Sequence, residues 1–296
     1  MTINTNVASD PLVQVGSSGR RQLSDILGLT LLQIFLTIMF ILFLLPFAWM
    51  ILSSLKASTE VFAVTWIPER PRWQNYVDVF TMVPFARFLL NSAIVVVLAV
   101  LGTVVSSALV AYSFARLSWP GRDFWFGLLI ATMMLPDVVT LIPRFVIFRE
   151  LRWLNTLLPL IVPYWFAATP LYVFLMRQFF RGLPMELDEA AWIDGANRVQ
   201  ILFRILLPLA TPVIATVGVF AMLQHYQDFL NPLIFLNQIE QYTVALGVSY
   251  FNDSDAARTE LIFAAATIMV APMVLLFVSA QRFFVQGIAM TGFGGR

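Results

Sequence analysis

A hydrophilic helix signal stands between two apolar segments in the second half of the chain. It reads Glu189-Ala190-Ala191-Trp192-Ile193-Asp194-Gly195-Ala196 and is followed by Ile205-Leu206-Leu207-Pro208-Leu209. Charged residues grouped in a short helix, with long apolar runs on both sides, favour a loop that protrudes from a membrane-embedded protein. The pattern therefore predicts a docking helix carried by membrane-spanning segments.

The composition also indicates a lipid environment. Hydrophobic residues make up 59% of the 296-residue chain, charged residues make up 12%, and the mean hydropathy is +0.82. This is more apolar surface than a soluble fold of that length can bury. A helix needs about 20 apolar residues to cross the hydrocarbon core of a bilayer. Six stretches suit that role: 26–52, 88–114, 124–142, 157–179, 205–225 and 261–284.

These apolar runs are continuous rather than alternating, which favours helices over the strands of a barrel. We therefore expect an all-α membrane protein with six transmembrane helices. Residues 1–24 are expected to form a cytoplasmic tail without a cleaved signal peptide. Residues 25–296 are expected to form the transmembrane domain, with a hydrophilic loop at 180–204.

The distribution of positive residues favours one orientation. With the N-terminus in the cytoplasm, ten of the 18 lysines and arginines lie on the inner side. Arg20 and Arg21 directly precede the first span, and four arginines surround the connection between the fourth and fifth spans: Arg177, Arg181, Arg198 and Arg204. Positive residues collect on the cytoplasmic side of membrane proteins. Both termini are therefore expected in the cytoplasm.

Several chemistries are excluded by missing residues. Lys56 is the only lysine and lies outside any G-x-x-x-x-G-K-[ST] loop, so the chain is not expected to bind and hydrolyse ATP itself. His225 is the only histidine and there is no cysteine, which argues against a metal site and against catalysis by a thiol or a Ser-His-Asp relay. No catalytic residue, metal or nucleic-acid partner is expected.

The hydrophilic loop has helix signals at both ends. Pro184 suits the first turn of a helix, and Gly195 suits a left-handed cap after its last turn, which predicts a helix of about eleven residues, ~16 Å long. Asn197 is expected to cap the helix that follows. Negative charge in the first turn stabilises a helix through its dipole, and the residues that supply it are Glu186, Asp188 and Glu189. An alternative is an interfacial helix that only tethers the loop.

This loop resembles the cytoplasmic coupling loop of the permeases of binding-protein-dependent ABC importers. Further landmarks resemble the sugar-importing branch of that family: Met134-Leu135-Pro136, Leu141-Ile142-Pro143, Asn155-Thr156, Gln178-Phe179-Phe180, Leu183-Pro184 and the tail Gln281-Arg282-Phe283-Phe284-Val285-Gln286-Gly287-Ile288. The chain departs from that branch at Tyr226-Gln227-Asp228, where Trp-Asn usually precedes the acidic residue, and at Gly294-Gly295-Arg296, where Lys-Gly is usual.

The resemblance implies the type I permease fold of ABC importers, with a coupling helix that sits in a cleft of the ATPase subunit. By position, the ATPase-coupling residues are Glu189, Ala190, Ala191, Asp194 and Gly195. The implied partners are a second homologous permease, two ATPase subunits that bind ATP and Mg, an external solute-binding protein, membrane lipid and a carbohydrate substrate. The implied location is the cytoplasmic membrane of a bacterial or archaeal cell. The two alanines are expected to allow close approach of the partner surface.

Polar groups in lipid-spanning helices are costly unless they face protein or water. Asn91, Asp137 and Asp228 are therefore candidates for the solute pathway, and Asp137 either faces a cavity at a bend after Pro136 or pairs with Arg144. A second group suits hydrogen bonding and stacking to a sugar, and consists of Tyr226, Gln227, Asp228 and Asn231. Tyr226 alone also suits interfacial anchoring.

The expected function is the ATP-driven import of a sugar, oligosaccharide or related polyol. Two alternatives remain at this point. One is an ABC permease for a solute that is not a sugar. The other is an ion-coupled secondary transporter, although the two halves of the chain show no convincing repeat of the kind common in such transporters.

Overall fold

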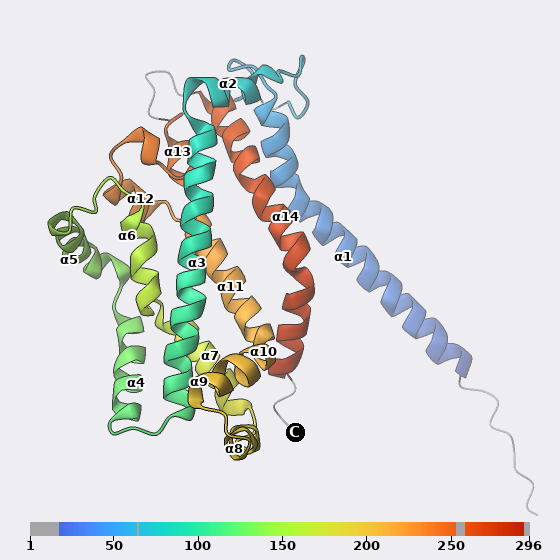
Figure 1. Cartoon of the computed structure of the whole chain (residues 1–296). Helices are drawn as coiled ribbons and strands as arrows, with labels where there is room; N and C mark the ends of the chain where they lie inside the picture. The colour runs from blue at the N-terminus through green and yellow to red at the C-terminus, as the bar shows by residue number, and fades with distance from the viewer. Residues whose placement is uncertain (1–17, 64, 253–257, 293–296) are drawn as a thin grey trace, which may run out of the picture. The chain divides into compact units, whose positions relative to one another are not determined.

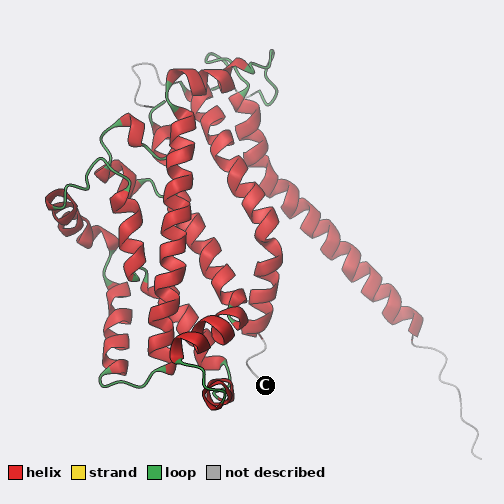
Figure 2. Ribbon diagram, viewed as in Figure 1, coloured by secondary structure: helices red, strands yellow, loops and turns green. Residues whose placement is uncertain are grey.

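The computed structural model describes residues 18–63, 65–252 and 258–292, with the backbone alone described at 18–25, 27 and 279–292. It is helical, and no strand occurs among these residues (Figures 1 and 2). The all-α prediction is confirmed. The chain divides into two compact units, residues 1–51 and 52–296.

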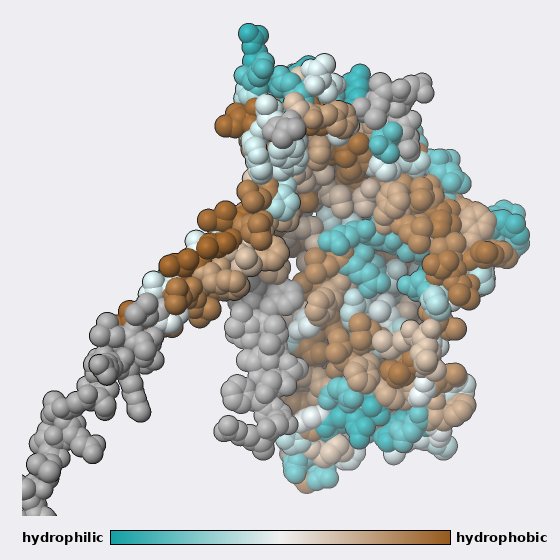
Figure 3. Space-filling view, turned by 180° about the vertical axis from the view of Figure 1, so that it is seen from behind, coloured by the Kyte–Doolittle hydropathy of each residue, from teal (hydrophilic) through white to brown (hydrophobic). Residues whose placement is uncertain are grey.

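The first unit consists of the helix α1, which is Ser18–Ser54 and whose last turn enters the second unit. Helix α1 already begins inside the segment expected to be a tail, while residues 1–17 lie outside the described part. From Gly28 to Ser54 it is long and apolar enough to cross a membrane. Phe35, Phe40 and Phe43 are all exposed, and Figure 3 shows hydrophobic residues (brown) along the helix. A helix that is apolar on all sides suits a lipid environment.

The second unit is built around one long helix, α3 (Phe85–Arg116), which packs against α7, α11 and η2 (Figure 1). The other elements, in chain order, are α2 (Gln74–Met82), α4 (Arg122–Ala131), η1 (Thr132–Met134), α5 (Asp137–Glu150), α6 (Leu158–Ile161), η2 (Val162–Phe166), α7 (Pro170–Gly182), α8 (Glu186–Ile193), α9 (Arg198–Ile201), the π-helical turn η3 (Leu202–Leu206), α10 (Leu207–Leu209), α11 (Thr211–Tyr226), α12 (Leu230–Phe235), η4 (Ile239–Gln241), α13 (Val244–Ser249) and α14 (Thr259–Gly292).

Four helical segments in the described part are long and apolar enough to cross a membrane: Gly28–Ser54, Phe85–Arg116, Leu158–Gly182 and Thr259–Val278. Two further pairs pass the same test but are bent, Arg122–Met134 with Asp137–Glu150 by 101° and Arg198–Leu209 with Thr211–Tyr226 by 78°. If each bent pair is one span, the described residues contain six spans. The bend after Pro136 was expected from the sequence.

The break in the third stretch has a local cause. Leu135 adopts an extended conformation, with φ −77° and ψ 121°, between η1 and Pro136. A proline disfavours the helical conformation of the residue before it, so the helix stops there and α5 starts anew at Asp137. The 124–142 stretch is therefore a broken segment and not one continuous helix.

Candidate functional site

The hydrophilic loop lies at one end of the second unit, near the α3–α4 turn and opposite to α2 and α13 (Figure 1). Its helix, α8, has eight residues, Glu186–Ile193, so the expected length of about eleven was too long. Leu183 is extended, with φ −77° and ψ 142°, because Pro184 follows it. Met185 then caps the helix and its carbonyl accepts hydrogen bonds from the next turn.

The end of α8 forms as its sequence predicts. Gly195 has a φ of +81°, in the left-handed region that favours glycine, and its amide donates to the Trp192 carbonyl at 3.0 Å. Asn197 caps α9: its side chain accepts from the Gln200 amide at 2.9 Å, and the Gln200 side chain accepts from the Asn197 amide at 2.8 Å. This reciprocal pair is a capping box, which fixes the exit of the loop toward α9.

Removing this cap should destabilise the loop exit. Asn197→Ala should lower the free energy of unfolding by about 1 kcal/mol, because the Gln200 amide loses its acceptor at the N-terminus of α9. Thermal unfolding of the detergent-purified chain measures the change. Asn197→Ser keeps an acceptor oxygen and should restore most of the loss; equal stability of the alanine variant and the unmodified chain would contradict the cap's contribution.

The five predicted coupling residues divide into two groups. Glu189, Ala190, Asp194 and Gly195 are exposed on the loop. Ala191 is only 6% exposed and packs in the chain's own core with residues of α3, α7 and α11. The expectation that both alanines meet a partner is therefore corrected: Ala190 is open to a partner, whereas Ala191 lets α8 lie close to the bundle.

Two apolar side chains on the loop were missed by the sequence analysis. Trp192 is 49% exposed and Ile193 is 87% exposed. They stand beside the carboxylates of Glu189 and Asp194 in the same short helix and its cap. Exposed apolar groups bordered by charge are typical of protein docking surfaces. Their position inside the acidic motif was the available signal.

The inner face of α8 carries a buried charge. Asp188 is 2% exposed, and its Oδ2 lies 3.1 Å from Nη1 of Arg116 at the end of α3. Burial raises the pKa of Asp188, and the neighbouring Arg116 guanidinium opposes that shift. The second guanidinium nitrogen, Nη2, donates to the Leu183 carbonyl at 2.8 Å. No sequence signal pointed to this pair, because its members are 72 positions apart (188 − 116).

Two of the predicted pathway residues form hydrogen bonds to main-chain carbonyls inside the protein. Asn91 is buried and donates both amide hydrogens to main-chain carbonyls, of Glu240 at 2.9 Å and Tyr242 at 3.0 Å. Tyr226 is 7% exposed and its hydroxyl donates to the Met269 carbonyl at 2.8 Å. These contacts tie α3 and α11 to neighbouring segments, and they occupy the amide hydrogens of Asn91 and the hydroxyl hydrogen of Tyr226.

The remaining pathway candidates gather near one another. Asp228 accepts from the Asn231 amide at 3.2 Å and from its side chain at 2.8 Å. Both Asp137 and Arg144 lie close enough to influence the ionisation of Asp228. Arg144 donates to the main-chain carbonyl of Asp137 at 3.4 Å, but the described residues contain no ion pair between the two side chains, so the expected charge pairing is not found. Gln227 is exposed beside this group.

Tyr164 of η2 also belongs to this polar group. Its ring lies edge-on to His225 with centroids 4.2 Å apart, and Asp228, Arg144 and Asp137 all act on it electrostatically. No sequence pattern points to Tyr164, because a tyrosine flanked by apolar residues has no distinguishing spacing or neighbours. The group defined by Asp137, Arg144, Tyr164, Asp228 and Asn231 is called the polar cluster below.

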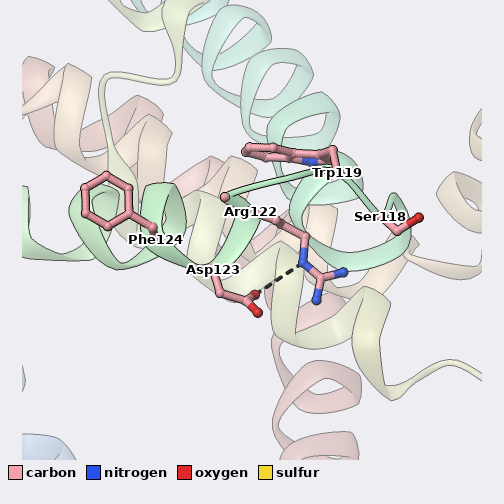
Figure 4. A pocket seen from close by; sticks show the side chains of 6 residues that line it. Ser118, Trp119, Arg122, Asp123 and Phe124 are labelled. Atoms are coloured by element: carbon pink, nitrogen blue, oxygen red, sulfur yellow. Dashed lines mark hydrogen bonds and ion pairs between the residues drawn. The ribbon is translucent and has the colours of Figure 1, made fainter.

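A hollow of about 310 Å³ lies in the α3–α4 turn, lined by Ser118, Trp119, Gly121, Arg122, Asp123 and Phe124 (Figure 4). The two charged residues that line it form an ion pair, with Nε of Arg122 3.2 Å from Oδ1 of Asp123. Asp123 remains 77% exposed and also lies 3.9 Å from the Arg177 guanidinium. The hollow is shallow and separate from the polar cluster, and we assign no ligand to it.

These features define a class of protein: a helical membrane protein with a docking helix at one end and a polar cluster among its spans. The chain belongs to the family described as binding-protein-dependent transport system inner membrane component, which matches residues 104–290. The predicted resemblance to the permeases of binding-protein-dependent ABC importers is confirmed.

Individual relatives are similar over nearly the whole chain. A sulfoquinovosyl glycerol transport system permease protein of Agrobacterium fabrum is 34% identical over 254 residues, which cover 85% of this chain and 89% of the relative. An arabinooligosaccharides transport system permease protein of Halalkalibacterium halodurans is 31% identical over 281 residues, covering 93% and 100%.

The fold has also been observed in a solved complex. A chain in the crystal structure of a bacterial ABC transporter involved in the import of the acidic polysaccharide alginate superposes with a TM-score of 0.75, covering 91% of this chain and 99% of that chain at 21% identity. The predicted ABC importer permease fold is therefore confirmed.

Proposed function

We propose that the chain is the permease subunit of an ABC importer that moves a carbohydrate into the cell. The observation that carries the proposal is the exposed, acidic helix α8 at one end of an apolar bundle. Relatives that are 34% and 31% identical are named for sulfoquinovosyl glycerol and arabinooligosaccharides. Both are built from sugars, which supports a carbohydrate, and the loop end of the bundle is then cytoplasmic, together with both termini.

The energy source lies in partner subunits under this proposal. The only lysine, Lys56, is fully buried and donates to the Thr65 carbonyl at 2.6 Å, so it is tied to a connecting segment and not to a phosphate-binding loop. Two ATPase subunits bind ATP and Mg. A second permease completes the membrane part, and an external binding protein delivers the solute.

The docking surface on this chain consists of Glu189, Ala190, Asp194 and Gly195, joined by Trp192 and Ile193. Carboxylates at its edge offer acceptors to basic groups of an ATPase subunit, and the exposed apolar side chains offer area to bury. ATP binding closes the ATPase dimer, α8 moves with it, and the spans change from an inward-open to an outward-open arrangement.

The solute passes the polar cluster on its way through the bundle. Asp228 can accept hydrogen bonds from sugar hydroxyls, Asn231 and Gln227 can donate or accept them, and Tyr164 offers a ring edge or face. Asn91 and Tyr226 hold the surrounding segments in place through their bonds to main-chain carbonyls.

Reconstitution tests the function. The complex copurified from its native membrane should contain two ATPase subunits and a second permease, and in proteoliposomes it should import the sugar found on its binding protein only when ATP is enclosed. The control is an ATPase subunit that binds but does not hydrolyse ATP, which should abolish uptake. Uptake that follows an ion gradient and persists without the ATPase would instead support a secondary transporter, and a bound solute without sugar chemistry would refute the carbohydrate assignment.

A further inference from the structure

Helix α3 connects the two ends of the second unit through side-chain bonds. At the end opposite to α8, Asn91 holds the carbonyls of Glu240 and Tyr242, and the Ser92 hydroxyl accepts from the Val244 amide at 2.8 Å. In its middle, the Ser106 hydroxyl donates to the Tyr164 carbonyl at 2.9 Å. Any displacement of α3 along its axis therefore acts on the polar cluster and on the 240–244 segment.

At the α8 end, one side chain of α3 makes most of the polar contact with the loop. The Arg116 guanidinium approaches three residues in succession: it donates to the Leu183 carbonyl at 2.8 Å, contacts the Met185 sulfur at 2.6 Å and pairs with Asp188 at 3.1 Å. The paired side chains are 2% and 3% exposed. One turn earlier on α3, the Tyr112 hydroxyl donates to the Arg198 carbonyl at 3.1 Å, on the far side of the loop.

For the Arg116–Asp188 pair, burial matters more than the distance between the two charged groups. An exposed ion pair contributes little and yields easily to water. A buried pair adds little net stability, but removing one partner leaves an uncompensated charge, so the two groups stay together when their helices move. Oδ2 of Asp188 accepts no hydrogen bond in the described part of the chain, which leaves Arg116 as its compensation.

The loop's acidic residues therefore have different roles. Glu189 and Asp194 point outward to a docking partner, whereas Asp188 points inward to α3. Packing around Ala191 and Phe180 supports the same contact, and apolar packing allows sliding. Separating the buried pair would leave each charge uncompensated, so the pair resists sliding.

We propose that Arg116 and Asp188 are positioning residues that transmit the movement of α8 to α3. The proposal rests on the proposed function, because it presumes that an ATPase subunit moves α8. Movement of α8 pulls on the Arg116 side chain, and α3 carries the displacement to the polar cluster and the 240–244 segment. The pair touches neither solute nor nucleotide. It determines how much solute is imported for each ATP that is hydrolysed.

The test compares uptake with ATP hydrolysis in the reconstituted complex. Asp188→Asn keeps the side chain's size and removes its charge, and it should reduce the amount of solute imported per ATP by about fivefold or more, the lower range of coupling between sites. ATP hydrolysis itself should continue. Asp188→Glu restores the charge and should recover most of the uptake. Glu150→Gln is the control, since Glu150 pairs with Arg149 at 2.8 Å and both side chains are exposed, at 70% and 59%, and it should leave the ratio unchanged.

A second variant separates transmission from folding. Arg116→Gln with Asp188→Asn removes both charges, so no unpaired charge remains buried and thermal stability should return toward that of the unmodified complex. The imported solute per ATP should stay low. Recovery of that ratio in the double variant, or an unchanged ratio in Asp188→Asn, would overturn the proposal. An unmodified complex that shows no ATP-driven uptake would instead refute the proposed function.

Discussion

Glu189→Lys and Gly195→Pro are each expected to reduce ATP-driven uptake by about tenfold or more, the effect of losing ~1.4 kcal/mol of docking free energy. Glu189 is exposed on α8, so lysine places a positive charge where the partner is expected to supply basic groups. Gly195 has a φ of +81°, whereas proline holds φ near about −65° and has no amide hydrogen. That variant therefore also loses the bond to the Trp192 carbonyl.

Both variants should remain in the membrane, because neither changes an apolar span. Solute uptake by proteoliposomes and copurification of the ATPase subunit are the two measurements. Glu186→Lys is the charge-matched control, since Glu186 is also exposed in the first turn of α8 but lies outside the acidic motif. Gly182→Ala is the backbone control, with nothing within 4 Å of the added carbon. Full uptake by both test variants would exclude α8 as the coupling element.

The membrane fold could be predicted because lipid imposes one strong requirement. Backbone groups inside a bilayer must be paired within a helix, so long apolar runs translate directly into helices such as Phe85–Arg116 and Thr259–Gly292. Local backbone conformation could also be predicted from the sequence. Pro136 predicted the bend between η1 and α5, and Gly195 predicted the left-handed residue after α8.

The same sequence patterns did not predict which side chains of α8 face the bundle and which face outward. Ala190 and Ala191 are adjacent and chemically identical, yet one is exposed and the other is packed in the core. The acidic residues present the same difficulty, because Asp188 and Glu189 look equivalent in a helix's first turn. What distinguishes them is Arg116, far away in the sequence, whose position depends on how α3 packs.

The residues of the solute pathway could be predicted only in part, for the same reason. Intramembrane polarity correctly marks a residue as costly to bury, but it does not say whether the main chain or a solute satisfies that residue. Asn91 and Tyr226 are satisfied by backbone carbonyls, whereas Asp228 lies near Arg144 and Tyr164. That grouping requires η2, α5 and the α11–α12 turn to meet, which depends on the tertiary fold.

Gly247→Val is expected to cost about 3 kcal/mol of stability, the upper part of the usual range for overpacking a core. Gly247 lies in α13, and a Cβ added there would overlap the ring of Phe88, which is fully buried on α3. The ring atoms concerned include Cγ, which rotation of the ring about its own axis leaves in place, so relief requires a different χ1 rotamer of a fully buried side chain or a shift of α3. Thermal unfolding of the detergent-purified chain, and its yield from membranes, should both fall sharply.

Gly218→Val separates crowding from the general effect of valine in a helix. Gly218 is in the interior of α11 and has nothing within 4 Å of an added carbon, so the substitution carries the same β-branched side chain without the overlap. It should leave thermal stability almost unchanged. Equal loss in the two variants would mean that helix propensity and not contact with Phe88 governs the result. A stable Gly247→Val chain would show that α13 and α3 are not held in close contact, and the link from α3 to the 240–244 segment would then be loose as well.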